Sequence, residues 1–105
     1  MVYFYPKAST PGCTAEACSL RDNYDRFLEA GYNVVGISRD SVKVQKNFSD
    51  KNALPFPLLS DHDASIIKAF GAWGEKKLYG KTYEGILRKT FIFNEKGELV
   101  EIIDK

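Results

Sequence analysis

Hydrophobic residues in the first half of the chain occur at two alternating spacings, one typical of strands and the other of helices. The β-branched and aromatic runs at residues 2–5 and 33–38 predict buried strands, and residues 56–59 predict a shorter extended segment. Between the first two runs, apolar residues at helical spacing predict one long helix from Cys13 to Gly31. Its inward face would consist of Ala17, Leu20, Tyr24, Phe27 and Leu28.

A second helix is predicted after the strand at residues 33–38. Asp40 or Ser41 can cap its first turn, and the helix should end near residue 54 because a proline follows. The helical spacing within this segment places Val44 and Phe48 on the inward face.

The second half of the chain has a different pattern. Residues 63–70 predict a brief helix closed by a glycine, and the glycine- and lysine-rich residues 71–85 predict a long irregular loop. Residues 87–93 and 99–103 predict strands joined by a hairpin turn at residues 94–97. Strands that alternate with helices imply an α/β fold with a largely parallel sheet, to which the last hairpin adds an antiparallel edge.

Composition agrees with a single domain over residues 1–105. Hydrophobic residues make up 44% of the chain, charged residues 28%, and the net charge is +1, so neither nucleic acid nor a membrane is an expected partner. No apolar run approaches the ~20 residues of a membrane-spanning helix. Pro6 and Lys7 end the N-terminal apolar run too early for a signal peptide. We therefore expect a soluble cytoplasmic protein.

The chain has two cysteines, Cys13 and Cys18, separated by four residues. Two cysteines are too few for a small secreted disulfide scaffold. Together with the single histidine, His62, they cannot supply the four ligands of a structural zinc site, so no metal is expected. The remaining interpretations are a redox pair and two ordinary buried cysteines.

Cys13 is predicted where a loop after a buried strand becomes the first turn of a helix. Free N–H groups and the helix dipole favour a thiolate at such a position. An ordinary thiol is ~3% ionised at pH 7, so complete ionisation increases its reactivity at most ~30-fold. Any larger acceleration must come from positioning and polarising the substrate.

The spacing of the two cysteines has a geometric consequence. In an intact helix their Cα atoms would lie ~8.6 Å apart, with side chains directed ~140° away from each other, whereas a disulfide needs a Cα separation of ~4.4–6.8 Å. If Cys13 and Cys18 form a disulfide, the first helical turns must therefore unwind.

The segment from Pro6 to Cys13 matches the pattern P-x-x-x-T-x-x-C, and through it the chain resembles the peroxiredoxins. Residues 3–21, YFYPKASTPGCTAEACSLR, resemble the bacterioferritin-comigratory, or Q-type, subfamily. The resemblance extends over essentially the whole chain, through VGIS at 35–38, PLLSD at 57–61, FGAWGEK at 70–76 and GKTY at 80–83. It implies a thioredoxin-like α/β fold, in which helices flank a central mixed sheet.

The resemblance also implies a role for each site residue. Cys13 matches the peroxidatic cysteine, whose thiolate attacks a peroxide and becomes a sulfenic acid. Thr10 matches the threonine that hydrogen-bonds the thiolate and the peroxide, and Pro6 the proline that shields the sulfur. Arg88 matches an arginine on a neighbouring strand that steadies thiolate and substrate. Cys18 matches the resolving cysteine, which would form an intramolecular disulfide with Cys13.

Partners follow from the same resemblance. Hydrogen peroxide and alkyl hydroperoxides would be the substrates, and thioredoxin or a similar dithiol protein would reduce the disulfide. The resemblance implies no cofactor. Q-type relatives are commonly monomers, so a monomer is expected. The chain departs from the pattern because the N-terminal segment and the C-terminal helix of the family are not found in it. We therefore expect a truncated core of the family's domain.

Other interpretations remain open. The chain could be a thioredoxin-like disulfide exchanger or a redox sensor without peroxidase turnover, although such proteins prefer C-x-x-C and have no use for Thr10 with Arg88. A copper-chaperone-like module would need a further histidine near the cysteines. Thr10 could be an ordinary turn residue, Pro6 could merely end a strand, and Arg88 could be a solvated charge on a strand.

Overall fold

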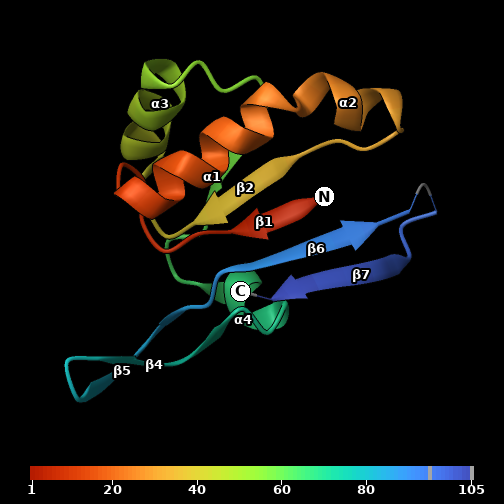
Figure 1. Ribbon diagram of the computed structural model, residues 1–105. Coiled ribbons are helices and arrows are strands. Elements are labelled where there is room, and N and C mark those ends of the chain that lie inside the picture. Colours follow the sequence, from red (N-terminus) through yellow and green to blue (C-terminus); the bar gives the residue numbers. More distant parts are fainter. Residues whose placement is uncertain (95, 105) are drawn as a thin grey trace.

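The computed structural model of the protein describes residues 1–94 and 96–104 (Figure 1). Its main sheet has five strands in the order β3-β2-β1-β6-β7. The strands β1, β2 and β3 pair in parallel, whereas β6 is antiparallel to both β1 and β7. In chain order these strands are β1 (Val2–Phe4), β2 (Val35–Ser38), β3 (Leu58–Ser60), β6 (Lys89–Phe93) and β7 (Leu99–Asp104). The predicted α/β class is confirmed, with a mixed sheet.

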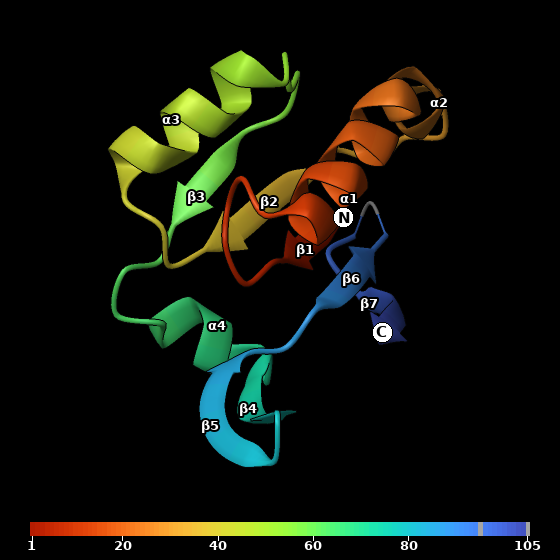
Figure 2. The ribbon, with the colours of Figure 1, turned by 60° about the vertical axis from the view of Figure 1, so that its left-hand side comes forward.

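Helices cover the two faces of this sheet unequally (Figures 1 and 2). The helices α1 (Pro11–Asp22), α2 (Tyr24–Glu29) and α3 (Val42–Lys51) lie on one face, and the short α4 (Ser65–Ala69) lies on the other. Among the described residues, no helix has the length and apolar character needed to cross a bilayer.

Alternation along β1 divides the core into two clusters, because successive side chains of a strand point to opposite faces. Tyr3 and the following Tyr5 pack with Cys13 and Phe48 beneath α1 and α3. Phe4 points the other way and packs with the side chains beside α4. The peptide that leads to the first cysteine is thus fixed from both sides of the sheet.

The long first helix predicted from Cys13 to Gly31 is interrupted. It starts at Pro11, and α1 and α2 are separated at Asn23, whose backbone leaves the helical region (φ −108°, ψ 7°) and whose side-chain amide donates to the carbonyl of Ser19 at 2.8 Å. Asparagine competes for backbone hydrogen bonds in this way and tends to end helices. Because helical spacing is not continuous across the break, Leu28 is 43% exposed rather than inward as predicted.

The second helix is shorter than predicted and has a different inward residue. Ser41 caps α3 by accepting a hydrogen bond from the amide of Val44, as expected. Val44, however, is 42% exposed, and Gln45 is buried in its place. Gln45 can be buried because its amide nitrogen donates to Ser38 Oγ and to the carbonyl of Leu59.

The prediction of an irregular loop at residues 71–85 is wrong. This segment forms an antiparallel hairpin of β4 (Trp73–Leu78) and β5 (Lys81–Ile86) that extends away from the main sheet (Figure 2). Tyr79 and Gly80 both have positive φ, as a two-residue type I′ turn requires. The strands are largely exposed and polar on both faces, so they lack the alternation that identifies a half-buried strand.

The C-terminal hairpin agrees more closely with the sequence. At the turn predicted for residues 94–97, the amide of Gly97, with φ +80°, donates to the carbonyl of Asn94 at 3.0 Å. Residue 95 lies outside the described residues. The predicted strand at 87–93 begins only at Lys89, so Leu87 and Arg88 link β5 to β6.

Candidate active site

Cys13 is held in the first turn of α1, directly after the loop that leaves β1. Thr10 is the N-cap residue with an extended backbone, Pro11 occupies the first helical position, and the amide of Thr14 donates to the carbonyl of Thr10 at 2.9 Å. The Cys13 side chain is 2% exposed. The structure therefore places this thiol at a helix N-terminus above the carboxyl end of β1, as predicted.

Arg88 approaches this thiol from the side of β1 on which β6 lies. The register pairs Thr90 of β6 with Tyr3 of β1. Because the two strands are antiparallel, Arg88, two residues before Thr90, lies level with the carboxyl end of β1. Arg88 Nη2 is 3.2 Å from Cys13 Sγ. Although Arg88 precedes β6 and is not within a strand as predicted, sheet pairing still brings it to the sulfur.

Glu16 orients the guanidinium. Its Oε1 is 3.0 Å from Arg88 Nη1, and it lies one helical turn after Cys13, on the same side of α1. The two ends of the guanidinium therefore contact the sulfur and the carboxylate at once, a geometry that the rigid fork of arginine allows and lysine does not.

The surroundings of Arg88 favour its charged form. Burial works against the charge of Arg88, but the hydrogen bond to Cys13 and the negative charges of Cys13 and Glu16 raise the pKa of Arg88 above its ordinary value. The hydrogen bond to the sulfur has a charged donor, which makes it stronger than a bond between neutral groups. Arg88 is thus a permanent cation beside a nucleophile that is almost completely buried.

Thr10 and Pro6 lie in the loop that precedes Cys13. The Thr10 hydroxyl donates to the carbonyl of Lys7 at 2.9 Å, so its described hydrogen bond is to the loop backbone and not to the sulfur. Pro6 is half-buried. Their predicted roles at the sulfur remain predictions.

A polar network that sequence reasoning missed fixes this loop. The amide of Ala8 donates to Asp40 Oδ2 at 2.7 Å, and Ser38 Oγ donates to the same oxygen at 2.9 Å. Gln45 donates to Ser38 Oγ at 3.0 Å and accepts a hydrogen bond from the hydroxyl of Tyr5. The one sequence feature that indicates this network is Ser38, a serine at the end of an apolar strand. The sequence pattern predicts only a helix cap for Asp40.

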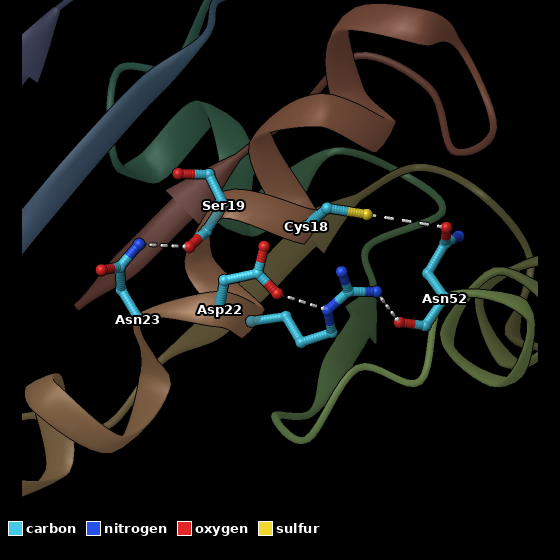
Figure 3. A network of polar contacts seen from close by, with 6 residues as sticks. Cys18, Ser19, Asp22, Asn23 and Asn52 are labelled. Atoms are coloured by element: carbon cyan, nitrogen blue, oxygen red, sulfur yellow. Dashed lines mark hydrogen bonds and ion pairs between the residues drawn. The ribbon is translucent and has the colours of Figure 1, made fainter.

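The Cys18 side chain points toward Asn52, the residue that ends α3 (Figure 3). Its Sγ lies 3.7 Å from Asn52 Oδ1, and both cysteines are free thiols. Both lie within the uninterrupted helix α1, where five residues of helical rise hold their Cα atoms ~8.6 Å apart, beyond disulfide reach. In this conformation the two thiols are not bridged, and a disulfide between them would require part of α1 to unwind.

No three His, Cys, Asp or Glu side chains among the described residues are grouped so that they could hold a metal ion. Within that part of the chain, the chemically distinctive arrangement is the contact between Cys13 and Arg88. It pairs a buried nucleophile with a fixed cation, which suits attack on a small substrate whose leaving group gains negative charge.

Comparison with known proteins identifies the class to which this fold and site belong. The sequence pattern of the AhpC/TSA family matches residues 1–102, and the chain belongs to this family. Peroxiredoxin Bcp of Escherichia coli strain K12 is 49% identical over 104 residues, which cover 99% of this chain and 67% of that protein. A protein of Mycobacterium tuberculosis strain CDC 1551 that is also named as a peroxiredoxin is 54% identical over 100 residues, covering 95% and 64%.

Solved structures give the same result. A mutant of Xanthomonas campestris peroxiredoxin Q superimposes with a TM-score of 0.92 at 45% identity, covering 98% of this chain and 66% of that one. The bacterioferritin comigratory protein of the same organism, described for its alkyl peroxide reduction activity, gives a TM-score of 0.91 at 44% identity, with the same coverage. These matches confirm the predicted Q-type resemblance and thioredoxin-like fold. The chain spans about two thirds of the length of these relatives.

Proposed function

We propose that this chain is a thiol peroxidase that reduces hydrogen peroxide and organic hydroperoxides. The observation that carries the proposal is the 3.2 Å contact between Arg88 Nη2 and Cys13 Sγ at the start of α1. The relatives named as peroxiredoxins, and the alkyl peroxide reduction described for the Xanthomonas campestris protein, support it.

The chemical step is a nucleophilic attack by the Cys13 thiolate on one peroxide oxygen. The S–O bond forms as the O–O bond breaks, and the departing oxygen leaves as water or alcohol once it is protonated, so Cys13 becomes a sulfenic acid. Arg88, oriented by Glu16, offers N–H donors both to the thiolate and to an oxygen that gains negative charge. We assign Thr10 to hydrogen bonding of the peroxide and Pro6 to shielding of the sulfur.

Cys18 would complete the turnover. Its thiol condenses with the Cys13 sulfenic acid, a disulfide forms and water leaves. Because the two residues are five positions apart in an intact helix, part of α1 must open before they meet. Thioredoxin or a similar dithiol protein then donates two electrons and two protons, which restores both thiols.

The remaining assignments follow from the same proposal. Residues 1–105 would form one thioredoxin-like domain that acts as a monomer in the cytoplasm. The chemistry uses only the two thiols, the peroxide and the dithiol reductant, so it requires no metal or organic cofactor.

Peroxide consumption tests this function directly. With thioredoxin, thioredoxin reductase and NADPH, we expect the chain to consume hydrogen peroxide. The Cys13→Ser substitution should abolish this consumption. The Cys18→Ser variant should react once and then fail to recycle efficiently. Ala15→Ser, an exposed position on the same helix, serves as a control and should behave like the wild type. Undiminished turnover by Cys13→Ser would refute the assignment of Cys13.

A further inference from the structure

Asn52 connects the helix that carries both cysteines to its neighbour (Figure 3). It is the C-cap residue of α3. Its backbone carbonyl accepts a hydrogen bond from Arg21 Nη1 at 2.8 Å, and its side-chain Oδ1 accepts from Cys18 Sγ at 3.7 Å. One residue thus contacts α1 at two positions, one of which is the second cysteine.

The orientation of the Asn52 amide is fixed by a third contact. Its Nδ2 donates to the carbonyl of Phe48 at 3.0 Å, one turn earlier in α3. Because the oxygen and nitrogen of an amide lie in one plane and point in different directions from the same carbon, this bond leaves Oδ1 directed toward α1. Phe48 itself is buried in the core. The acceptor that faces Cys18 is therefore anchored to a rigid part of the molecule.

Cys18 has to break this contact before it can approach Cys13. The opening of α1 carries the Cys18 sulfur away from α3, and the bond from Arg21 to the Asn52 carbonyl holds the end of the same helix. Arg21 also forms an ion pair with Asp22, at 3.0 Å. Contacts present only in the closed conformation lower the population of the open one.

We propose that Asn52 is a positioning residue that holds Cys18 against α3 in the reduced protein and thereby limits the rate of disulfide formation. The inference rests on the proposed role of Cys18 as the resolving thiol. It has a consequence for the fate of Cys13. A sulfenic acid that waits for Cys18 can react with a second peroxide, which transfers one oxygen to form a sulfinic acid and leaves as water or alcohol.

The first test measures how accessible the Cys18 thiol is. In a Cys13→Ser background, Cys18 is the only cysteine, and its alkylation by iodoacetamide reports how often the half-buried thiol is released from Asn52. Asn52→Ala removes the side-chain acceptor and keeps the carbonyl that binds Arg21. We expect alkylation about 2- to 10-fold faster, as the loss of one hydrogen bond implies. Should Asn52→Ala fail to fold, Asn52→Ser makes the same test with a side chain too short to keep both contacts.

Asn23→Ala is the matched control. Asn23 also binds α1 through its amide, at the carbonyl of Ser19, but has no described contact with Cys18. We expect its alkylation rate to equal that of the Cys13→Ser parent. Equal rates for Asn52→Ala and the parent would overturn the proposal. Equal acceleration by both asparagine variants would overturn it too, because it would show a general loosening of α1.

The second test separates this inference from the proposed function. With both cysteines present, Asn52→Ala should leave the rate of Cys13 oxidation by hydrogen peroxide unchanged. It should accelerate the following disulfide step about 2- to 10-fold. As a result, less sulfinic acid should form at high peroxide concentration. If the chain does not react with peroxide, the proposed function fails, but the alkylation rates still decide whether Asn52 holds Cys18. An unaltered disulfide step alongside normal oxidation would refute the inference alone.

Discussion

At the residue scale we expect Arg88 to contribute most to reactivity, because ionisation of Cys13 alone explains little. Complete conversion of an ordinary thiol to thiolate gains only about 30-fold. The guanidinium lies 3.2 Å from the sulfur and 3.0 Å from Glu16, so it is held in place before a substrate arrives. We attribute to this fixed cation the stabilisation of the oxygen that leaves.

Replacing Arg88 should therefore slow the first chemical step. Arg88→Met removes a charge-assisted donor and should reduce the rate of Cys13 oxidation by hydrogen peroxide about 10- to 100-fold. Arg88→Lys keeps the charge but cannot contact Cys13 and Glu16 with one rigid group, so an intermediate rate is expected. Stopped-flow fluorescence measures these rates. Arg26→Met, exposed on α2, is the control, and a wild-type rate in Arg88→Met would contradict the account.

At this scale the sequence predicted the positions of Cys13 and Arg88, while the roles of Thr10, Pro6 and Cys18 remain predictions. Sequence reasoning placed Cys13 at a helix N-terminus and selected Arg88 from a distant part of the chain, and the structure brings the two together. It did not find the hydrogen bond from the amide of Ala8 to Asp40. A backbone amide of one loop that meets a carboxylate 32 residues away leaves no periodic signal in the sequence.

Packing at the centre of the sheet holds the elements of the site together. Gly36 of β2 pairs with Tyr3 of β1 and with Leu58 of β3. A Cβ atom at Gly36 would lie 2.8 Å from atoms of both the Tyr3 ring and the Leu58 side chain. Tyr3 is buried among the side chains beneath α1, so its ring has little freedom to move away.

Gly36→Ala should consequently destabilise the fold. We expect a loss of about 1–3 kcal/mol, the usual cost of overpacking a core, measured as a lower urea midpoint by circular dichroism. Gly85→Ala in β5 is the matched control, because a Cβ there would lie 3.4 Å from the Lys76 and Tyr83 side chains. The control should stay within about 0.5 kcal/mol of the wild type. Equal midpoints for the two variants would contradict this packing argument.

The elements that the sequence mispredicted depend on local interactions that leave no apolar periodicity in the sequence. The β4–β5 hairpin is polar on both faces, so its strands carry no alternation, although Tyr79-Gly80 is the turn that joins them. The break at Asn23 depends on a side chain that binds its own helix. The strands and helices that contribute to the two core clusters, by contrast, follow the apolar pattern because burial requires it.

For the molecule as a whole, two buried tyrosines, Tyr3 in β1 and Tyr5 directly after it, link stability to pH. Burial raises the pKa of Tyr5 to about 12, although hydrogen bonds with Ser38 and Gln45 oppose the rise. Burial also raises the pKa of Tyr3, whose hydroxyl has no hydrogen-bond partner among the described residues. Both side chains are therefore uncharged in the fold at a pH where an unfolded chain would ionise them.

Stability should fall at alkaline pH for this reason. The folded pKa exceeds the unfolded value of about 10, so the contribution is complete below pH 10 and is lost as the pH rises toward 12. Tyr5→Phe cannot ionise and should lose less stability between pH 8 and pH 11 than the wild type, as measured by urea midpoints. Tyr79→Phe, 95% exposed, should follow the wild type. The same pH dependence in Tyr5→Phe and wild type would rule this explanation out.

A single-turnover reaction tests the central claim most directly, namely that Cys13 reacts with peroxide and Cys18 then closes a disulfide by opening α1. The reduced chain is mixed with one equivalent of hydrogen peroxide, quenched with acid and examined by thiol titration and peptide mass spectrometry. We predict that both thiols are lost, that Cys13 and Cys18 are found in one disulfide, and that Cys18→Ser instead retains a sulfenic acid on Cys13. Two intact thiols after the reaction, or an equally fast loss of the thiol in Cys13→Ser, would contradict the account.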